Sequence, residues 1–481
     1  MTRQQRLTLV ATILGSTVVF LDSTVVNVAL PAIAEDLDAG LAGQQWVVEA
    51  YLLTLVSLLL VGGSLGDRFG RRRMFVAGLV GFGVTSVLCA LAPSVEFLGV
   101  ARALQGIAGA LLVPGSLAIV AATFEGEARG RAVGTWTAWT GIATVFGPAG
   151  GGALIEALSW RAIFWINVPL IALTVLLTLR AVRESRDPEA FTDFDWPAVV
   201  LSAVGLGGPV FALVEQPNLG WGDPAVWIPL LAGVACLGLF LLREARARQP
   251  MLDLGLFRIR NFWVANLTTL AAYGGLIGGL FFLTLFLQQV GGYSPLEAGL
   301  ATTPISVVLF LLSPRFGRFA SSVGPRLPMT AGPIVAGLGL LLLLRVDADA
   351  AYLPDVLPGV LVFSLGLAAT VAPLTATVLD SVEERQVGVA SGVNNGISRV
   401  AGLLAIAVLG AAISAKFGAE VGGGGAGSNP LTASAPEAST SAFHLGIAIA
   451  ALLMIAGGVV SWLGIEDRRP SGERSALGSG P

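Results

Sequence analysis

The sequence is poor in charged residues. Asp, Glu, Lys and Arg make up 12% of its 481 residues, whereas hydrophobic residues make up 54%. A soluble domain carries roughly 25% charged residues. This composition excludes an ordinary soluble domain and indicates a chain that lies mostly in lipid.

Residues that carry catalytic or metal chemistry are also scarce. The chain has one histidine and two cysteines, Cys89 and Cys236, which both fall in long apolar runs and predict no disulfide framework. A membrane enzyme would need clustered His, Cys or paired acids at membrane depth. We therefore expect no enzymatic activity, no metal site and no cofactor.

Two further signals are missing. The chain has no Gly-x-x-x-x-Gly-Lys-Ser/Thr loop for phosphate, since its only lysine, Lys416, is followed by Phe417. ATP is therefore not the expected energy source. No stripe of basic and aromatic residues indicates nucleic-acid binding either.

The chain contains instead a series of long apolar runs. A run of ~20 apolar residues spans the hydrocarbon core as a helix, and lipid excludes unpaired backbone groups, so repeated runs predict a helical bundle. The predicted fold class is an all-α polytopic membrane protein. Its fourteen predicted spans are residues 9–31, 46–66, 74–92, 97–123, 133–155, 162–180, 196–214, 225–242, 262–288, 297–313, 327–344, 353–378, 388–412 and 443–463.

Arginine placement predicts the orientation. With the N-terminus inside, 23 of the 28 Lys and Arg residues fall in cytoplasmic segments, as the positive-inside rule requires. Three fall outside, and two, Arg102 and Arg399, lie within spans. We expect a multi-pass protein of the bacterial cell membrane with both termini in the cytoplasm.

Two loops on the basic side resemble each other and indicate an internal repeat. They are residues 62–74 (GGSLGDRFGRRRM) and 317–326 (GRFASSVGPR). Transporters are commonly built from two such halves, with the substrate site at the interface. The aligned positions are Gly63 with Gly317, Gly70 with Gly324, Arg72 with Arg326, Asp67 with Ser321 and Arg68 with Ser322.

The repeat predicts how the chain is divided. Two six-helix halves leave two spans over, and the seventh and eighth lie between the halves without a copy of the loop. The predicted parts are residues 1–195 (first half), 196–260 (inserted pair with a basic linker), 261–463 (second half, with a flexible outer loop at 413–442) and 464–481 (cytoplasmic tail).

Four motifs stand in the first five spans and the loops between them. They are Leu21-Asp22 through Asn27-Val28-Ala29-Leu30-Pro31, Gly63-x-x-x-Asp67-Arg68-x-Gly70-Arg71-Arg72, Leu98-x-x-x-Arg102-x-x-Gln105-Gly106 and Gly147-Pro148-x-x-Gly151-Gly152. With these motifs the chain resembles the major facilitator superfamily, in particular its fourteen-span drug:proton antiporter branch of the quaternary-ammonium-resistance type. Trp160-Arg161 and Asn167-x-Pro169 also fit that branch. The fifth-span motif departs from the usual pattern in having Ala143 in place of its first glycine.

Asp22 and Arg102 are the predicted proton-coupling residues. Ionisable groups inside a span are costly and mark pathways or proton relays. At 1.5 Å per residue, Asp22 lies ~12 Å and Arg102 ~8 Å from the outer ends of their helices. Burial raises the pKa of a carboxyl and a nearby arginine lowers it. A proton switch requires such opposing effects. The alternative is a static ion pair.

The loop at residues 62–74 predicts a cytoplasmic latch. An acid there is placed to face the positive N-terminus of another helix and to pair with arginine. We expect Asp67 to meet the start of the thirteenth span near Gly388. We also expect Arg71 or Arg72 to reach Glu125 or Glu127 at the end of the fourth span. The alternative is that the arginines only set orientation. The latch residues are Gly63, Asp67, Arg68, Gly70, Arg71, Arg72, Glu125 and Glu127.

Other polar residues at membrane depth are candidates for the substrate cavity. Glu49 could take part in the proton relay or could be an ordinary acid at the membrane interface. Asn394 and Asn395 could hydrogen-bond substrate or could bridge neighbouring helices. In the fifth span, Gly147-Pro148 kinks the helix and Gly151-Gly152 allow a neighbour to approach, as a seal or as ordinary packing. The cavity candidates are Asn27, Glu49, Gln105, Asn394, Asn395 and Arg399.

The resemblance implies a secondary transporter that exports hydrophobic drugs or related small molecules in exchange for protons, by alternating access. Its partners would be a hydrophobic substrate, protons and the bilayer, with no nucleic acid, and we expect a monomer. The proton gradient replaces any cofactor. The alternatives are a proton-coupled symporter that imports a nutrient and, more remotely, a membrane enzyme or receptor.

The arginine pattern yields a test of topology. Reporter fusions at residue 220 should read as extracytoplasmic, and fusions at residue 250 as cytoplasmic, because Arg243, Arg246 and Arg248 follow the eighth span. Alkaline phosphatase activity measures the first and green fluorescence the second. A cytoplasmic signal at residue 220 would remove the inserted pair and leave twelve spans.

Overall fold

In the computed structural model the chain is helical, as predicted. The structure describes residues 1–186, 195–247, 250, 252–383, 386–422 and 429–467, and no strand occurs among them. The helices are α1 (Arg3–Leu37), α2 (Leu41–Phe69), α3 (Arg71–Ala90), α4 (Val95–Thr123), α5 (Gly126–Ala157), α6 (Ala162–Trp165), α7 (Asn167–Ala181), α8 (Trp196–Leu219), α9 (Pro224–Glu244), η1 (Leu254–Arg258), α10 (Arg260–Gln289), α11 (Pro295–Val323), α12 (Arg326–Leu342), η2 (Leu343–Arg345), η3 (Tyr352–Val356), α13 (Leu357–Asp380), α14 (Val387–Val421) and α15 (Pro436–Gly464).

Most of these helices are long enough to cross a bilayer. Within the described residues, twelve helical segments are long and apolar enough, with α6 and α7 together forming one of them. The bent helix α2 makes a thirteenth. Helix α5, 32 residues long, contains the fifth predicted span but is not in that set. The all-α membrane fold is confirmed, whereas the count of fourteen stays a prediction.

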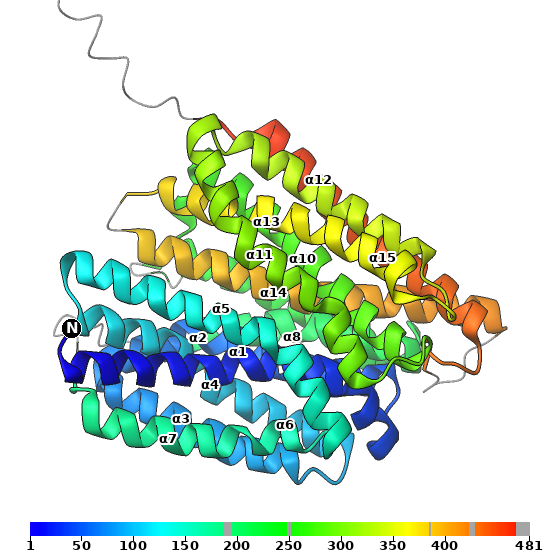
Figure 1. The fold of residues 1–481 in the computed structure, drawn as a ribbon, viewed down its shortest axis with the longest axis horizontal. Helices are drawn as coiled ribbons and strands as arrows, with labels where there is room; N and C mark the ends of the chain where they lie inside the picture. The colour runs from blue at the N-terminus through cyan, green and yellow to red at the C-terminus, as the bar shows by residue number, and fades with distance from the viewer. Residues whose placement is uncertain (187–194, 248–249, 251, 384–385, 423–428, 468–481) are drawn as a thin grey trace, which may run out of the picture.

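The helices form two groups (Figure 1). Helices α1–α7 lie together in the lower part of the view and α10–α15 in the upper part, with α8 at their boundary. Within the first group α1 packs on α5 and α7, and α2 on α4; within the second, α10 packs on α14 and α15, and α11 on α13. These are the pairings that two copies of one six-helix unit give, and they support the predicted repeat.

The inserted helices α8 and α9 pack mainly on each other. Helix α8 also contacts α2 and α14, so the pair covers the side on which these two helices meet. The opposite seam between the groups is formed by α5 and α11.

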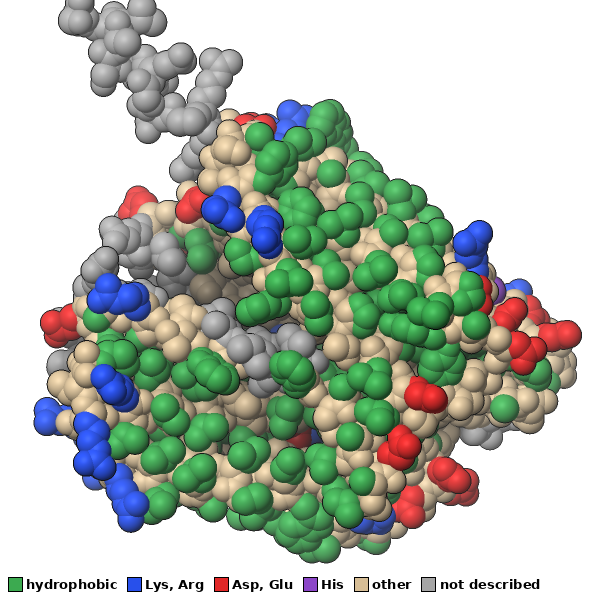
Figure 2. Space-filling model, in the orientation of Figure 1, with side chains coloured by type: hydrophobic (Ala, Val, Ile, Leu, Met, Phe, Trp, Pro, Cys, Tyr) green, Lys and Arg blue, Asp and Glu red, His purple; other side chains and the backbone are tan. Residues whose placement is uncertain are grey.

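The two ends of the bundle differ. The basic end, defined here by residue 1 and the loop at 68–73, carries most of the Lys and Arg side chains seen in Figure 2. The far end, defined by the turn at residues 38–40, holds contacts between the groups, such as Gln288 Nε2 to the Val28 carbonyl (3.2 Å) and Gln289 Nε2 to Gln44 Oε1 (3.0 Å). At the basic end Figure 2 shows a hollow between the groups.

The repeated loops have the same geometry in three dimensions. Gly70 has φ +110° and Gly324 has φ +93°, backbone values that favour glycine. A carboxylate from the end of the same group lies where a Cβ would be: Glu184 at Gly70 and Asp467 at Gly324. Each glycine therefore leaves room for an acid at the start of the next helix.

The arginine two residues after each glycine, Arg72 or Arg326, is held by hydrogen bonds within its own group of helices. The backbone N–H of Arg72 donates to Glu184 Oε1 (3.1 Å), and that of Arg326 donates to Asp467 Oδ1 (3.0 Å). Their side chains donate to the carbonyls of Leu179 (2.7 Å) and Trp462 (2.9 Å). Carboxylates at helix N-termini are stabilising, so both loops are anchored to the last helix of their own half.

Candidate functional site

A buried ion pair lies inside the first group. Asp22 on α1 is 3% exposed and Arg102 on α4 is 1% exposed. Arg102 Nη1 lies 2.5 Å from Asp22 Oδ2, and Arg102 Nε donates to the Val47 carbonyl of α2 (2.9 Å). The two residues that sequence spacing placed at similar depth are thus in direct contact.

Three neutral polar side chains complete this network. Gln105 accepts from Arg102 Nη1 (2.7 Å) and donates to Asp22 Oδ1 (3.2 Å). Asn167 on α7 donates to Asp22 Oδ1 (3.3 Å) and to Ser86 Oγ (3.1 Å). All three side chains are fully buried. We call Asp22, Ser86, Arg102, Gln105 and Asn167 the Asp22 network.

Aromatic rings enclose the charged pair. The Arg102 guanidinium lies 4.3 Å from the centre of the Tyr51 ring and 5.9 Å from that of Phe164. Such contacts stabilise a desolvated cation by about 2 kcal/mol or more. The sequence motifs predicted no role for Tyr51, Ser86 or Asn167, although Asn167 belongs to the Asn167-x-Pro169 motif. A single polar residue within an apolar run was the only sequence feature that could have indicated Ser86 or Asn167.

Glu49 is buried apart from this network. Its side chain is fully buried, and neither carboxylate oxygen has a hydrogen-bond partner among the described residues. Gln45, one helical turn away, donates to the Ile406 carbonyl of α14 (2.8 Å). Residues four apart share a helix face, so Glu49 lies on the face of α2 that is turned toward the second group.

The remaining cavity candidates are not brought together. Asn394 on α14 donates to Asn266 Oδ1 (3.1 Å) and Thr269 Oγ1 (2.7 Å) of α10, which makes it a helix bridge. Asn395 is exposed and bonds back to Ser391 of its own helix. The Arg399 guanidinium lies 6.0 Å from the Phe20 ring of α1, across the interface of the groups. Asn27 has a buried Oδ1 without a partner among the described residues.

The predicted latch residues hold other contacts in this conformation. Asp67 pairs with Arg71 of its own segment (2.7 Å). Arg72 has the anchoring contacts described above and is not free to reach the end of α4. Arg68 lies over the Phe69 ring (5.2 Å). Glu125 is exposed, and the side chain of Glu127 lies outside the described residues.

The glycines of the fifth-span motif lie at two helix contacts. A Cβ on Gly147 would lie 2.4 Å from Thr24 Oγ1, and one on Gly151 would lie 2.4 Å from Val25 Cγ1, both on α1. A Cβ on Gly152 would lie 2.4 Å from the Pro295 carbonyl oxygen of α11. The motif therefore packs α5 on α1 within one group and on α11 across the seam.

The Trp160-Arg161 pair clamps the far end of α1. Asp36 accepts from Arg161 Nη1 (2.5 Å) and Trp160 Nε1 (3.1 Å). The hydrogen bonds from Arg161 and then Trp160 hold the pKa of Asp36 below its usual value. This clamp has a structural role, and it explains why the two residues stand side by side.

Among the described residues, no group of three His, Cys, Asp or Glu side chains could hold a metal ion. A bundle of apolar helices with a charged network at membrane depth defines the class as a polytopic membrane protein with an internal ionisable site. The Major Facilitator Superfamily model matches residues 12–406. The chain belongs to this superfamily.

Its relatives are named as resistance and efflux proteins. The chain is 37% identical over 420 residues to the multidrug resistance protein Stp of Mycobacterium tuberculosis (strain CDC 1551 / Oshkosh), covering 87% of this chain and 78% of that one. It is 36% identical to the tetracenomycin C resistance and export protein of Streptomyces glaucescens, covering 85% and 76%. With the puromycin resistance protein pur8 of Streptomyces alboniger it shares 33% identity over 98% of this chain and 93% of that one.

Solved structures share the fold. A bacterial homolog of the human lysosomal transporter Spinster, in an inward-facing and unoccupied conformation, has a TM-score of 0.69 at 17% identity, covering 96% of this chain and 97% of that one. The resemblance to the superfamily drawn from the motifs is thus confirmed by sequence and by fold.

The fifth-span contact yields a matched pair of variants. Gly152→Ala should reduce transport several-fold, because its methyl group meets the backbone of α11, which cannot rotate away. Gly150→Ala is the control, since a Cβ there meets nothing within 4 Å. Transport by cells with equal membrane levels of each protein measures the effect. Equal activity of the two variants would show that the α5–α11 contact is not required.

Proposed function

We propose that the protein is a secondary transporter that exports hydrophobic drugs or related small molecules in exchange for protons, by alternating access. The observation that carries the proposal is the Asp22 network, which holds one buried carboxylate between an arginine and neutral donors. The export and resistance names of its relatives support the direction of transport. It would lie in the bacterial cell membrane as a monomer, with both termini in the cytoplasm.

The network has the parts that proton coupling needs. In the present geometry Asp22 accepts from three donors, on Arg102, Gln105 and Asn167. A proton on Asp22 removes its charge, breaks the ion pair and leaves Arg102 to the Val47 carbonyl and Gln105. Because a lone buried charge is costly, protonation and rearrangement of α1 against α4 are coupled.

Glu49 supplies a second carboxyl at the interface of the halves. A carboxylate without partners in an apolar site is unfavourable, whereas the neutral acid is tolerated. In the conformation described here, Glu49 would therefore carry the proton while Asp22 is paired. When the halves separate at the far end, Glu49 would become accessible to water and release it.

The halves would alternate about the seams at α5–α11 and α2–α14. The present conformation is joined at the far end and hollow at the basic end, which we interpret as inward-facing. In the outward-facing state the basic end closes, and Asp67 would leave Arg71 to cap the start of α14. Arg72 would stay anchored to its own half throughout.

The rival function is proton-coupled import of a nutrient by the same fold. Everted membrane vesicles separate the two: acidifying their interior should drive an exporter to accumulate substrate inside, whereas a symporter would not. The host cells should lack their own exporters. The susceptibility of these cells to a panel of drugs is measured first, because the substrate must be chosen before the vesicle assay.

The coupling assignment predicts the effect of neutralising each acid. Asp22→Asn should reduce proton-driven export at least about tenfold while binding persists, since the amide is similar in shape and can still accept on one side, but it carries no charge and cannot exchange a proton. The double variant Asp22→Asn/Arg102→Gln removes the stranded cation and controls for misfolding.

Glu49→Gln should also uncouple export but fold like the parent, because the amide replaces a neutral acid. Export by Asp22→Asn at parental rates on both sides of neutral pH would exclude Asp22 as the coupling residue.

The latch assignment predicts an asymmetry between the two loops. Asp67→Asn should leave substrate binding intact and slow transport, because a charge-assisted pair is worth a few kcal/mol at most and that shifts a two-state equilibrium about tenfold or more. Ser321→Ala, the matched change in the second loop, should have little effect. Binding in detergent and efflux in cells measure the two steps. Lost binding in Asp67→Asn, or equal damage from both variants, would contradict the latch.

A further inference from the structure

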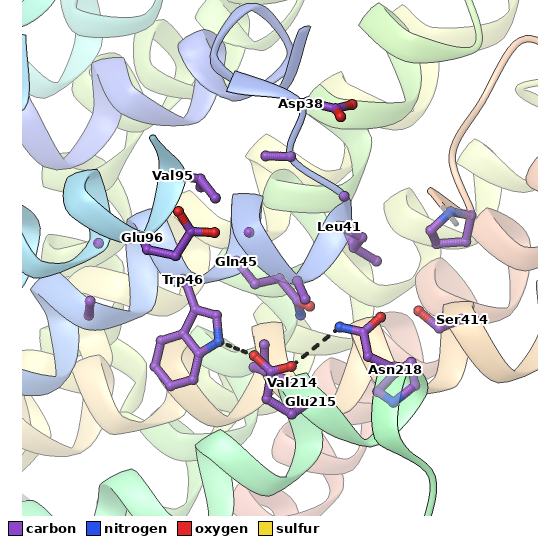
Figure 3. Close-up of a pocket in the computed structure, with 18 of the residues that line it drawn as sticks. Asp38, Leu41, Gln45, Trp46, Val95, Glu96, Val214, Glu215, Asn218 and Ser414 are labelled. Atoms are coloured by element: carbon purple, nitrogen blue, oxygen red, sulfur yellow. Dashed lines mark hydrogen bonds between the residues drawn. The ribbon is translucent and has the colours of Figure 1, made fainter. Parts of the chain in front are cut away.

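A cavity lies at the far end, outside the Asp22 network. It encloses about 570 Å³, within the range of sites that hold drug-sized molecules. Its walls come from the turn before α2, from α2 and α4 of the first half, from inserted helix α8, and from α14 of the second half. Figure 3 shows most of its lining residues.

The cavity is acidic. Three carboxylates reach it from three different elements: Asp38 from the turn before α2, Glu96 from α4 and Glu215 from α8 (Figure 3). None of the residues that line it, all within the described part of the chain, is basic. The uncapped N-terminus of α2 at Gly40 adds about half a positive charge, which leaves the cavity negative.

Glu215 is the acid most in need of a cation. It lies on α8 about one turn before the helix ends at Leu219, at the outer edge of the predicted span 196–214. It accepts from Trp46 Nε1 (2.7 Å) and Asn218 Nδ2 (3.3 Å), which are both neutral donors (Figure 3). These bonds orient the carboxylate without neutralising its charge.

The other walls suit an apolar, aromatic body. Trp46 and Phe417 line the cavity from opposite halves of the chain, with aliphatic Val95, Val100 and Val214 between the polar groups. Aromatic faces attract organic cations in addition to packing against apolar surface. At the rim, a hydrogen bond from Ser94 lowers the pKa of Glu96, so this acid is ionised at neutral pH.

We infer that this cavity is a second binding site, for a lipophilic organic monocation, in which Glu215 pairs with the positive charge and Trp46 contacts the apolar body. The site depends on inserted helix α8, which supplies Glu215. It is separate from the Asp22 network and does not rest on proton coupling.

The test uses the full chain in lipid nanodiscs, with tetraphenylphosphonium as the cation and triphenylphosphine oxide as a neutral aromatic of similar shape. Equilibrium dialysis with labelled cation gives Kd. Glu215→Gln should raise Kd about tenfold, as expected for loss of a partly desolvated charge pair. Glu96→Gln should raise it about threefold, as expected for an exposed pair.

Glu156→Gln is the matched control, because Glu156 is an exposed acid at the far end of α5 that does not line the cavity. Its Kd should equal that of the parent. Glu96 is also exposed, so its variant tests the site without any risk to folding. Asp22→Asn should keep tetraphenylphosphonium binding even where export is lost, which separates this inference from the proposed function.

Unchanged Kd in both Glu215→Gln and Glu96→Gln would overturn the inference, as would equal binding of the neutral probe. Two kinds of disc with an equal fraction of phosphatidylglycerol, and hence equal surface charge, identify the source of the natural cation; the remainder is phosphatidylethanolamine in one and a neutral glycolipid without an ammonium group in the other. Weaker tetraphenylphosphonium binding in the phosphatidylethanolamine discs would support the site and assign a lipid ammonium group to it. Equal binding in the two would support a free organic cation.

Discussion

The structure depends on how a buried charge is satisfied where water is excluded. Arg102 is fully buried at membrane depth and would be strongly unfavourable alone. Asp22, Gln105 and the Val47 carbonyl satisfy it, and to do so they bring α1, α2 and α4 together. Asn167 adds α7 through the same carboxylate, and its second hydrogen bond, to Ser86, adds α3. One ion pair thus links five helices of the first half. A change in its protonation would therefore act on the packing of that half as a unit, which is the property that the proposed coupling requires.

The second half has no equivalent charge network among its described residues, and its polar contacts are of another kind. Asn394 bridges α14 to Asn266 and Thr269 of α10 with neutral groups that no proton disturbs. The repeated loops show the same division. Both are anchored to their own half through an acid beneath a positive-φ glycine, but only the first keeps an Asp67–Arg71 pair beside the anchor. The common geometry holds each half rigid, and the extra charges in the first loop are available for a contact that changes between states.

Much of this was predictable from the sequence because membranes impose strong local rules. Apolar run length predicted the helices, and the rise per residue placed Asp22 and Arg102 at one depth. Glu184 and Asp467 could not be found in this way, because they follow α7 and α15 but bind at the starts of α3 and α12, far along the chain from their own positions. The same limit applies to Arg72, whose sequence suggested a mobile latch and whose contacts make it an anchor. Asn394 and Asn395 are adjacent in sequence, yet helical geometry turns one toward α10 and leaves the other exposed.

The inserted helices acquire a physical role from their position. A pair that only filled space against lipid would carry apolar side chains throughout, as most of α9 does. Helix α8 instead places Glu215 against Trp46 of the first half, beside residues of α14 in the second. Since α2 and α14 belong to halves that move relative to each other in alternating access, a cavity that needs both of them and α8 exists in full only while the far end is joined. A cation bound there would favour the conformation described here by its binding free energy, and by linkage that conformation would bind it more tightly. The insertion would thereby give the far side of the membrane a means of influencing a transport cycle whose proposed proton site lies in the first half alone.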